Sequence, residues 1–242
     1  MAFLQNMNEE AESDSGKGSP AGYKGLIDFG GHIAYHSKQF FDEFLTPMIK
    51  EQFDLCYDGS HTWFGSWENH MRKVITMFFL KGDSAIMEWG YNFDFLPIAK
   101  SNRIVYYRTE KSVRTQLWTY PKSFMDVTQW KDYKIPMHVR SKEELGKSIE
   151  AVWKLTLPEI MDWFLRVNSI ETAICEAEYQ IEYGKRYAIF SPRQLYVKAF
   201  LLAYTGDMES AERILKETLE YDDISEDMQG KLLKKLKNVY KI

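Results

Sequence analysis

The stretch KVITMFFLKGDSAIMEWGYNFDF, residues 73–95, decides the fold of this chain. Residues 73–80 are rich in the β-branched and aromatic side chains that strands favour, and KGDS at 81–84 is typical of a turn. From 85 to 95, two sets of side chains alternate with the two-residue period of a strand. One set is Ile86, Glu88, Gly90, Asn92 and Asp94, and the other is Met87, Trp89, Tyr91, Phe93 and Phe95. The stretch therefore predicts two antiparallel strands joined by a tight turn.

The segments on either side of this hairpin extend it into a layered structure. RIVYYRT (103–109) and VRTQLWTY (113–120) have strand-like composition and predict a second hairpin. Upstream, HSKQFFDEFLTPMIKEQF carries its apolar residues at helical spacing and predicts an amphipathic helix over 36–52. We expect an antiparallel sheet of about four strands or more, one face of which is covered by this helix.

From Ser141 onward the pattern is helical. Ser141 and Glu144 match the S-x-x-E capping box, ahead of a run to about Leu155, and Thr156 and Pro158 are typical of the start of a second helix. Four more helices are expected at 169–183 before Gly184, at 191–204 before Gly206, at 208–220 capped by Asp207, and at 226–241 capped by Ser225. The fold class predicted is α+β, with a helix-covered antiparallel sheet followed by an all-α six-helix region.

This pattern divides the chain into three unequal parts. Residues 1–22 are dominated by Asn, Glu, Ser, Gly and Pro, a composition that predicts a flexible arm. Residues 23–136 form the predicted α+β domain, and residues 141–242 form the predicted helical domain.

Composition excludes several classes of protein. The 242 residues carry 31 Lys and Arg against 35 Asp and Glu, so a net charge of −4 argues against a strongly basic polyanion binder. No stretch approaches the roughly 20 apolar residues that cross a bilayer, and the first residues lack the pattern of a secretory signal. Two cysteines, Cys56 and Cys175, give neither a disulfide framework nor a CxxC motif. We expect a cytoplasmic protein that does not insert into membranes.

Residues 191–220, SPRQLYVKAFLLAYTGDMESAERILKETLE, resemble one tetratricopeptide repeat. Ala199, Gly206, Asp207 and Ala211 stand where that repeat keeps small residues, which let two antiparallel helices approach closely. Asp223 stands where the repeat usually places a proline, and no second copy is evident upstream. An ordinary helical hairpin with a glycine stop is the alternative interpretation.

Residues 38–95 look like several poorly characterised bacterial α+β families, some of whose members are immunity proteins that neutralise toxins. The resemblance lies in the order FFDEFLTPMIK, a polar and aromatic hairpin, WENH, a strand and WGYNFDF. It implies an inhibitor that binds one partner protein and blocks it.

Few motifs point to a reactive centre. The phosphate loop GxxxxGK[ST], the dinucleotide fingerprint GxGxxG and the nucleophile elbow GxSxG do not occur, and DFGG at 28–31 lacks the segments that precede DFG in a kinase. His32 and His36 would share one face of a helix and could supply two metal ligands, although a polar pair at a helix start is favoured. His61, Glu68 and His70 could act as base and orienter if they meet in space. We expect no cofactor and no metal, and consider catalysis less favoured than binding.

Charge is distributed unevenly along the chain. Residues 101–150 hold ten basic against six acidic residues, and cations alternate with aromatics at Arg103, Tyr106, Tyr107, Arg108, Arg114, Trp118 and Tyr120. Such a hairpin could stack bases and neutralise phosphates. Residues 207–227 hold nine acidic against two basic residues, and the five lysines of 231–242 offer them an intramolecular counter-charge.

The sequence thus favours a protein-binding module, an inhibitor or immunity-type protein, that blocks a partner through its own acidic and aromatic surface; the partner is expected to have a basic surface. The candidate partner-binding residues are Glu209, Glu212, Asp222, Asp223, Glu226, Arg108, Arg114 and Trp118. One alternative is a nucleic-acid or nucleotide-binding protein that uses the hairpin 103–120. A second alternative is an enzyme centred on His61, Glu68 and His70.

Overall fold

The computed structural model describes residues 26–27, 33–36, 41–80, 84–100, 103–121, 130–136, 138–183, 192–221 and 224–239. The helices are α1 (Phe41–Phe53), α2 (Lys142–Arg166), α3 (Ile170–Glu182), α5 (Gln194–Thr205), α6 (Met208–Tyr221) and α7 (Glu226–Val239), with a 3₁₀ turn at Trp130–Tyr133. The strands are β1 (Leu26–Ile27), β2 (Ile33–His36), β3 (Cys56–Tyr57), β4 (Thr62–Phe64), β5 (Met71–Leu80), β6 (Ser84–Phe93), β7 (Ile98–Lys100), β8 (Arg103–Val105), β9 (Leu117–Thr119), β10 (Ile135–Pro136) and β11 (His138–Val139). The predicted α+β class is confirmed.

The main sheet is built on the hairpin that the sequence predicts at 73–95. Strands β5 and β6 are paired antiparallel over their whole length, from Met71 opposite Phe93 to Leu80 opposite Ser84. The sheet runs β10-β6-β5-β4-β3, and β9 also pairs with β6. Strand β10 pairs with the start of β6 and β9 with its end, so one edge of β6 serves two short strands. Smaller pairings join β1, β2 and β11, and β7 with β8.

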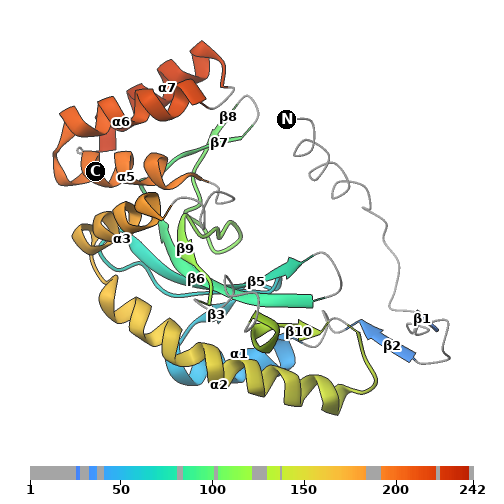
Figure 1. Ribbon diagram of the computed structural model, residues 1–242. Coiled ribbons are helices and arrows are strands. Elements are labelled where there is room, and N and C mark those ends of the chain that lie inside the picture. The colour runs from blue at the N-terminus through green and yellow to red at the C-terminus, as the bar shows by residue number, and fades with distance from the viewer. Residues whose placement is uncertain are drawn as a thin grey trace.

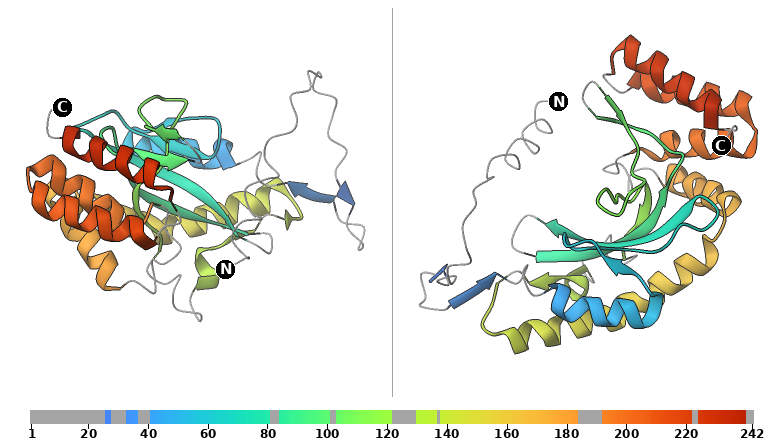
Figure 2. Two further views of the ribbon diagram at one scale, coloured as in Figure 1. Left: turned by 90° about the horizontal axis from the view of Figure 1, so that it is seen from above. Right: turned by 180° about the vertical axis from the view of Figure 1, so that it is seen from behind.

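One face of the sheet packs on helices. The side chain of Trp63 on β4 donates a hydrogen bond from Nε1 to Thr46 Oγ1 on α1, 2.9 Å away. Trp63 lies opposite Ile75, which lies opposite Trp89, and all three are almost fully buried. Helices α1 and α2 both lie on this side of the sheet (Figures 1 and 2). Because successive residues of a strand point to opposite faces, the neighbouring row points away from these helices.

The remaining helices form a stack that continues from α2. Helix α3 packs on α5, α5 on α6, and α6 on α7, as Figure 1 shows. One hydrophobic cluster includes Leu45 and Trp89 as well as Ala177, Phe200 and Leu236. The hydrophobic core therefore continues from the sheet into the helices, across the boundary predicted between 136 and 141.

The helix predicted over 36–52 begins later than expected. His36 belongs to β2, where it lies opposite His138 of β11, and α1 begins at Phe41. Residues 33–36, Ile-Ala-Tyr-His, follow the pairing available from β11 instead of the helical periodicity that begins with the Phe pair at 40–41.

The second hairpin predicted at 103–120 does not form. Strand β8 pairs with β7, and β9 pairs with β6. The chain between them is held by the almost fully buried Arg72 on β5, which donates from Nη2 to the carbonyl oxygens of Tyr107, Thr109 and Ser112 at 3.2–3.3 Å. These bonds to one guanidinium replace the ladder that a hairpin would need.

The helix break predicted near Thr156 and Pro158 is also absent. Helix α2 is continuous for 25 residues and contains Pro158. Its buried residues keep one helical spacing across the proline, from Ile149 and Trp153 through Thr156 to Ile160 and Trp163. Burial of this continuous stripe outweighs the loss of one backbone hydrogen bond at Pro158, which lies on the exposed side.

The signals at Ser141, Gly206 and Asp207 act as predicted, whereas α5 begins at Gln194, after the predicted start at 191, and its N-cap residue makes no side-chain cap. Ser141 accepts a hydrogen bond from the backbone of Glu144, and Asp207 caps α6 by accepting from the backbone of Ser210. Gly206 ends α5 in the left-handed conformation, with φ of 95°, which glycine adopts without strain. The arm predicted at 1–22 and the stop at Gly184 lie outside the described residues.

Candidate binding site

A row of polar side chains crosses the face of the sheet that points away from α1 and α2. Thr62 on β4 lies opposite Thr76 on β5, and Thr76 lies opposite Glu88 on β6. The two threonine hydroxyls are 2.9 Å apart and hydrogen bonded, and Thr76 also donates to the carbonyl oxygen of His61 at 3.2 Å. The pairing of three strands therefore places two hydroxyls beside one carboxyl group.

Glu88 is the unusual member of this row. Only 8% of the residue is exposed, and its Oε2 is buried with no hydrogen-bond partner among the described residues. Burial raises the pKa of its carboxyl group to about 8, while the positive charge of Arg114 opposes this rise. The group is thus largely protonated near neutral pH.

This carboxyl lines a pocket of about 330 Å³. Its lining residues are Thr62, Val74, Thr76, Phe78, Glu88, Val113, Arg114, Thr115 and Trp118. Phe78 is 41% exposed at the rim, which is unusual for a large apolar side chain. Ile86, Trp118 and Tyr120 form a small hydrophobic cluster on the same strands, separate from the main core. We call this the Glu88 pocket; its size suits one or two side chains or a small ligand.

One wall of the Glu88 pocket is the loop held by Arg72. Besides its three backbone carbonyls, Arg72 donates from Nε to Asn92 Oδ1 at 2.9 Å and lies over the ring of Trp67, 4.4 Å from the centroid. Burial lowers its pKa to about 10, so it stays charged at neutral pH. Arg72 fixes the loop that carries Val113, Arg114 and Thr115 to the pocket.

Strand β9, which carries Trp118, is fixed against β6 by a close backbone approach. A side chain on Gly90 would place its Cβ 2.1 Å from the carbonyl oxygen of Leu117 and 2.6 Å from Cα of Trp118. Gln116, just before β9, accepts hydrogen bonds from Asn92 Nδ2 at 2.9 Å and from the backbone of Phe93. Only glycine fits opposite Trp118, so residue 90 determines where this pocket wall stands.

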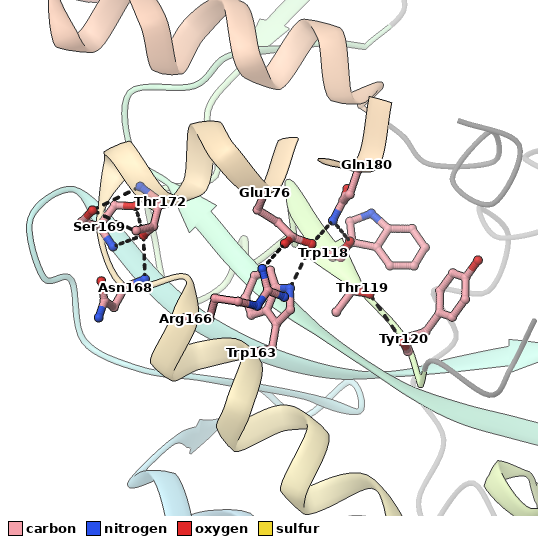
Figure 3. Close-up of polar contacts among 10 residues, drawn as sticks. All are labelled: Trp118, Thr119, Tyr120, Trp163, Arg166, Asn168, Ser169, Thr172, Glu176 and Gln180. Carbon is pink, nitrogen blue, oxygen red and sulfur yellow. Dashed lines mark hydrogen bonds and ion pairs between the residues drawn. The ribbon is translucent and has the colours of Figure 1, made fainter. Parts of the chain in front are cut away.

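From the other side, β9 is held by a buried network on the helices. Glu176 on α3 accepts hydrogen bonds from Trp163 Nε1 at 3.1 Å, from Arg166 at 2.6 Å and from Gln180 Nε2 at 2.9 Å. Gln180 Nε2 also donates to the carbonyl oxygen of Trp118 at 3.1 Å. Figure 3 shows the Glu176 side chain between these donors, with Gln180 reaching β9. The network joins α2, α3 and the strand that carries Trp118.

Two of the predicted partner-binding residues, Arg114 and Trp118, meet in the Glu88 pocket, and Arg108 does not line it. The guanidinium of Arg108 lies over the ring of Tyr106, 4.1 Å from the centroid, and that of Arg114 lies 5.8 Å from the ring of Tyr107. Trp118 and Tyr120 are buried. The aromatic rings of the predicted nucleic-acid hairpin are therefore largely covered by the protein itself.

Three of the predicted acidic residues, Glu209, Glu212 and Glu226, lie on α6 and α7, away from this row. Glu209 is exposed on the first turn of α6 and Glu226 on the first turn of α7. Glu212 forms ion pairs with Lys216 at 2.9 Å and with Lys237 of α7 at 3.4 Å, and these lysines lower its pKa. Asp222 and Asp223 lie outside the described residues. The contact between Glu212 and Lys237 is the intramolecular counter-charge that the sequence predicts.

The predicted histidine site is not assembled. The carbonyl oxygen of His61 bonds the backbone of Met77, whereas His70 precedes Met71, so the two histidines lie at opposite ends of β5, about 20 Å apart. His70 lies with Asn69 in a tight turn, where both have positive φ, and its Nδ1 is 3.0 Å from Asp94 Oδ2. Glu68, before this turn, is exposed.

Of the two histidines considered as possible metal ligands on a helix, the described one lies in a strand. His36 is in strand β2, and His32 lies outside the described residues. Within the ranges that the structure describes, no three His, Cys, Asp or Glu side chains are placed to hold a metal ion.

Sequence reasoning missed Glu88 as a site residue. The available signal was one carboxylate in the middle of an otherwise apolar strand, AIMEWG. The alternation of side chains predicted correctly on which face of its strand Glu88 lies. The loop 106–116 and strand β9 bury Glu88, but only the tertiary structure brings them next to it.

Comparisons with protein-family models, with curated proteins and with solved structures returned no match. In the described residues, no helix is long and apolar enough to cross a membrane.

Proposed function

We propose that this protein binds another protein through the face of the sheet that carries the Glu88 pocket. The observation that carries this proposal is the combination, in one pocket, of the exposed Phe78 and a buried glutamate, one oxygen of which has no hydrogen-bond partner among the described residues. Protein interfaces are commonly centred on pockets that receive one anchoring side chain of the partner, surrounded by apolar contacts. The expected role as an inhibitor, in the manner of an immunity protein, belongs to this proposal.

The acidic residues of α6 and α7 support the choice of a basic partner. Glu209 and Glu226 are exposed, and the whole chain carries a net charge of −4. Such a field raises the association rate of a positively charged partner without having to lie in the final contact. Because Glu212 is already paired with two lysines, we assign Glu209 and Glu226 to steering more than Glu212.

A protein partner is favoured over nucleic acid by the state of the aromatic residues. Stacking of bases needs open ring faces, and Trp118 and Tyr120 are buried while Tyr106 is covered by Arg108. The outer side of α2 also exposes Leu155, Met161 and Leu165, but the buried hydroxyl of this helix that has no described hydrogen-bond partner, on Thr156, belongs to the buried stripe of α2. The sheet face is therefore the better supported surface.

Site-specific photo-crosslinking in the organism that encodes the protein tests the proposal. A photoreactive phenylalanine is placed at Phe78 and, as a matched control of similar exposure, at Leu155 on the outer side of α2. We expect a discrete adduct with a basic protein from position 78, weakened by a second substitution, Thr62→Arg, which adds bulk and a positive charge to the lining of the pocket. An adduct from position 155 with none from position 78 would refute the proposed surface.

A further inference from the structure

Resting on the proposed function, we infer that the Glu88 pocket receives a cationic side chain of the partner, the ammonium group of a lysine or the guanidinium of an arginine. The carboxyl of Glu88 is the acceptor for this cation. The hydroxyls of Thr62 and Thr76 and the rings of Phe78 and Trp118 surround it.

Glu88 Oε2 is buried without a hydrogen-bond partner among the described residues. A buried polar atom without a hydrogen bond costs roughly 1–3 kcal/mol, so nearly all such atoms have partners in folded proteins. The other strongly buried carboxylate, Glu176, receives three donors from its own chain. Glu88 Oε2 receives none from any residue that the structure describes. Glu88 also lines the pocket, which is open beside Phe78, so a cation that enters the pocket would meet the Glu88 side chain at one of its walls.

The surroundings of Glu88 favour a charged donor over a neutral one. A cation beside a carboxylate forms a charge-assisted bond, about twice as strong as a neutral one, and the bond strengthens where water is excluded. The aliphatic stem of lysine or arginine would lie along Val74 and Phe78, and aromatic rings attract a cation at their faces. An anionic group would be repelled once the Glu88 carboxyl is ionised. Arg114, the cation among the described lining residues, has its guanidinium 5.8 Å from the centroid of the Tyr107 ring.

Binding of a cation is coupled to the loss of the proton from the Glu88 carboxyl. In the empty pocket the carboxyl is largely protonated at neutral pH, since burial raises its pKa to about 8. Binding of a cation therefore releases this proton to solvent and leaves an ammonium or guanidinium paired with a carboxylate. Arg114 is the charged group that faces Glu88 from the segment before β9; the lining residues on β4, β5 and β9 are uncharged. Affinity for the cation should then rise with pH up to about 8.

Titration of the full-length protein with n-butylguanidinium, which mimics an arginine side chain, tests the inference without the partner. The carbon-13 shift of the Glu88 carboxyl is followed against pH, with and without about 50 mM probe, a concentration suited to millimolar affinity. We expect the pKa of Glu88 to fall by one unit or more with the probe, and the affinity to rise roughly tenfold from pH 6 to pH 7. An unchanged pKa would overturn the inference.

Variants and a second probe make the result specific. Glu88→Gln keeps the volume of the side chain and should lose probe binding and its pH dependence, whereas Glu150→Gln, on an exposed position of α2, should bind as the unmodified protein does. Circular dichroism confirms that both variants are folded. n-Butyl phosphate should not bind; if it binds more tightly than the guanidinium, the pocket is an anion site and the inference is wrong.

The inference and the proposed function can fail separately. If Glu88→Gln leaves crosslinking from position 78 unchanged and the probe does not bind, the cation site is refuted and the binding surface stands. If the probe binds but position 78 forms no adduct, the pocket takes a small cation and the protein-binding proposal falls.

Discussion

Two buried glutamates, one in each half of the molecule, show how differently the fold can use the same side chain. Glu176 lies among helices and accepts hydrogen bonds from Trp163, Arg166 and Gln180. Glu88 lies on the sheet, is 8% exposed, and has an oxygen that no described donor reaches. Glu176 completes a hydrogen-bond network that stabilises the contact of α2 with α3, whereas Glu88 has an oxygen left to bind a ligand. Burial of a carboxyl thus has no single meaning, since the neighbours supplied by the fold decide it.

The largest expected effect tests the helical half of this comparison. Glu176→Ala leaves the indole N–H of Trp163 buried without an acceptor and removes one of the two acceptors of the Gln180 amide, so we expect a loss of about 4 kcal/mol in the free energy of unfolding. Denaturation by urea measures it. The control is Glu178→Ala on the same helix, where a more exposed carboxylate pairs with Lys198 and the loss should stay below about 1 kcal/mol. Equal losses in the two variants would mean that the network does not hold α2 to α3.

The second largest expected effect tests how Gly90 positions strand β9, which forms one wall of the Glu88 pocket. In Gly90→Ala the new Cβ would overlap the backbone of Leu117 and Trp118, so β9 must move away. We expect a loss of about 2–3 kcal/mol and a shifted Trp118 signal in NMR spectra of the indole N–H groups. Gly230→Ala on α7 is the matched control, because nothing lies within 4 Å of its Cβ and alanine favours helices; stability should rise by up to about 1 kcal/mol. Unchanged stability of Gly90→Ala would show that β9 can yield.

The smallest expected effect is a pH dependence of stability that comes from Glu88. In the folded chain the pKa of Glu88 is raised from 4.5 to about 8, so between these values the folded state holds a proton that the unfolded state has lost. Stability must therefore fall as pH rises through this window, by up to about 1.4 kcal/mol per pH unit. Glu88→Gln removes this contribution. Its free energy of unfolding, measured with urea, should therefore rise by about 2 kcal/mol relative to that of the unmodified protein as the pH goes from 5.5 to 7.5.

The control for this pH effect is an exposed carboxylate. Glu150→Gln, at an exposed position of α2, should run parallel to the unmodified protein over the same range. A constant difference between Glu88→Gln and the unmodified protein would mean that Glu88 is already ionised in the folded chain.

Features with a local cause could be predicted from the sequence. The hairpin of β5 and β6 follows from composition and alternation, and the ends of α5 and α6 follow from Gly206 and Asp207. The predictions that were wrong involve long-range competition. Residues 103–120 have strand composition, but the guanidinium of Arg72 takes three of their carbonyl groups. Pro158 signals a helix start, but a continuous buried stripe carries α2 through it.

The candidate site divides in the same way. Arg114 and Trp118 were recognised because cations interleaved with aromatics stand out in a sequence. That they meet beside Glu88, and that His61 and His70 lie at opposite ends of β5, depends on pairings between strands far apart in the chain.

The sequence by itself determined which segments become strands or helices wherever a short-range period or a capping residue sets the backbone. It also placed Glu88 on the same side of its strand as Ile86 and Gly90. Only the tertiary structure decided that Glu88 would be buried with an oxygen that no described donor reaches, while Glu176 would have three donors. The reason is physical: desolvation and hydrogen bonding depend on atoms brought close by folding, and those atoms come from β4, β5 and β9 for one glutamate and from α2 and α3 for the other.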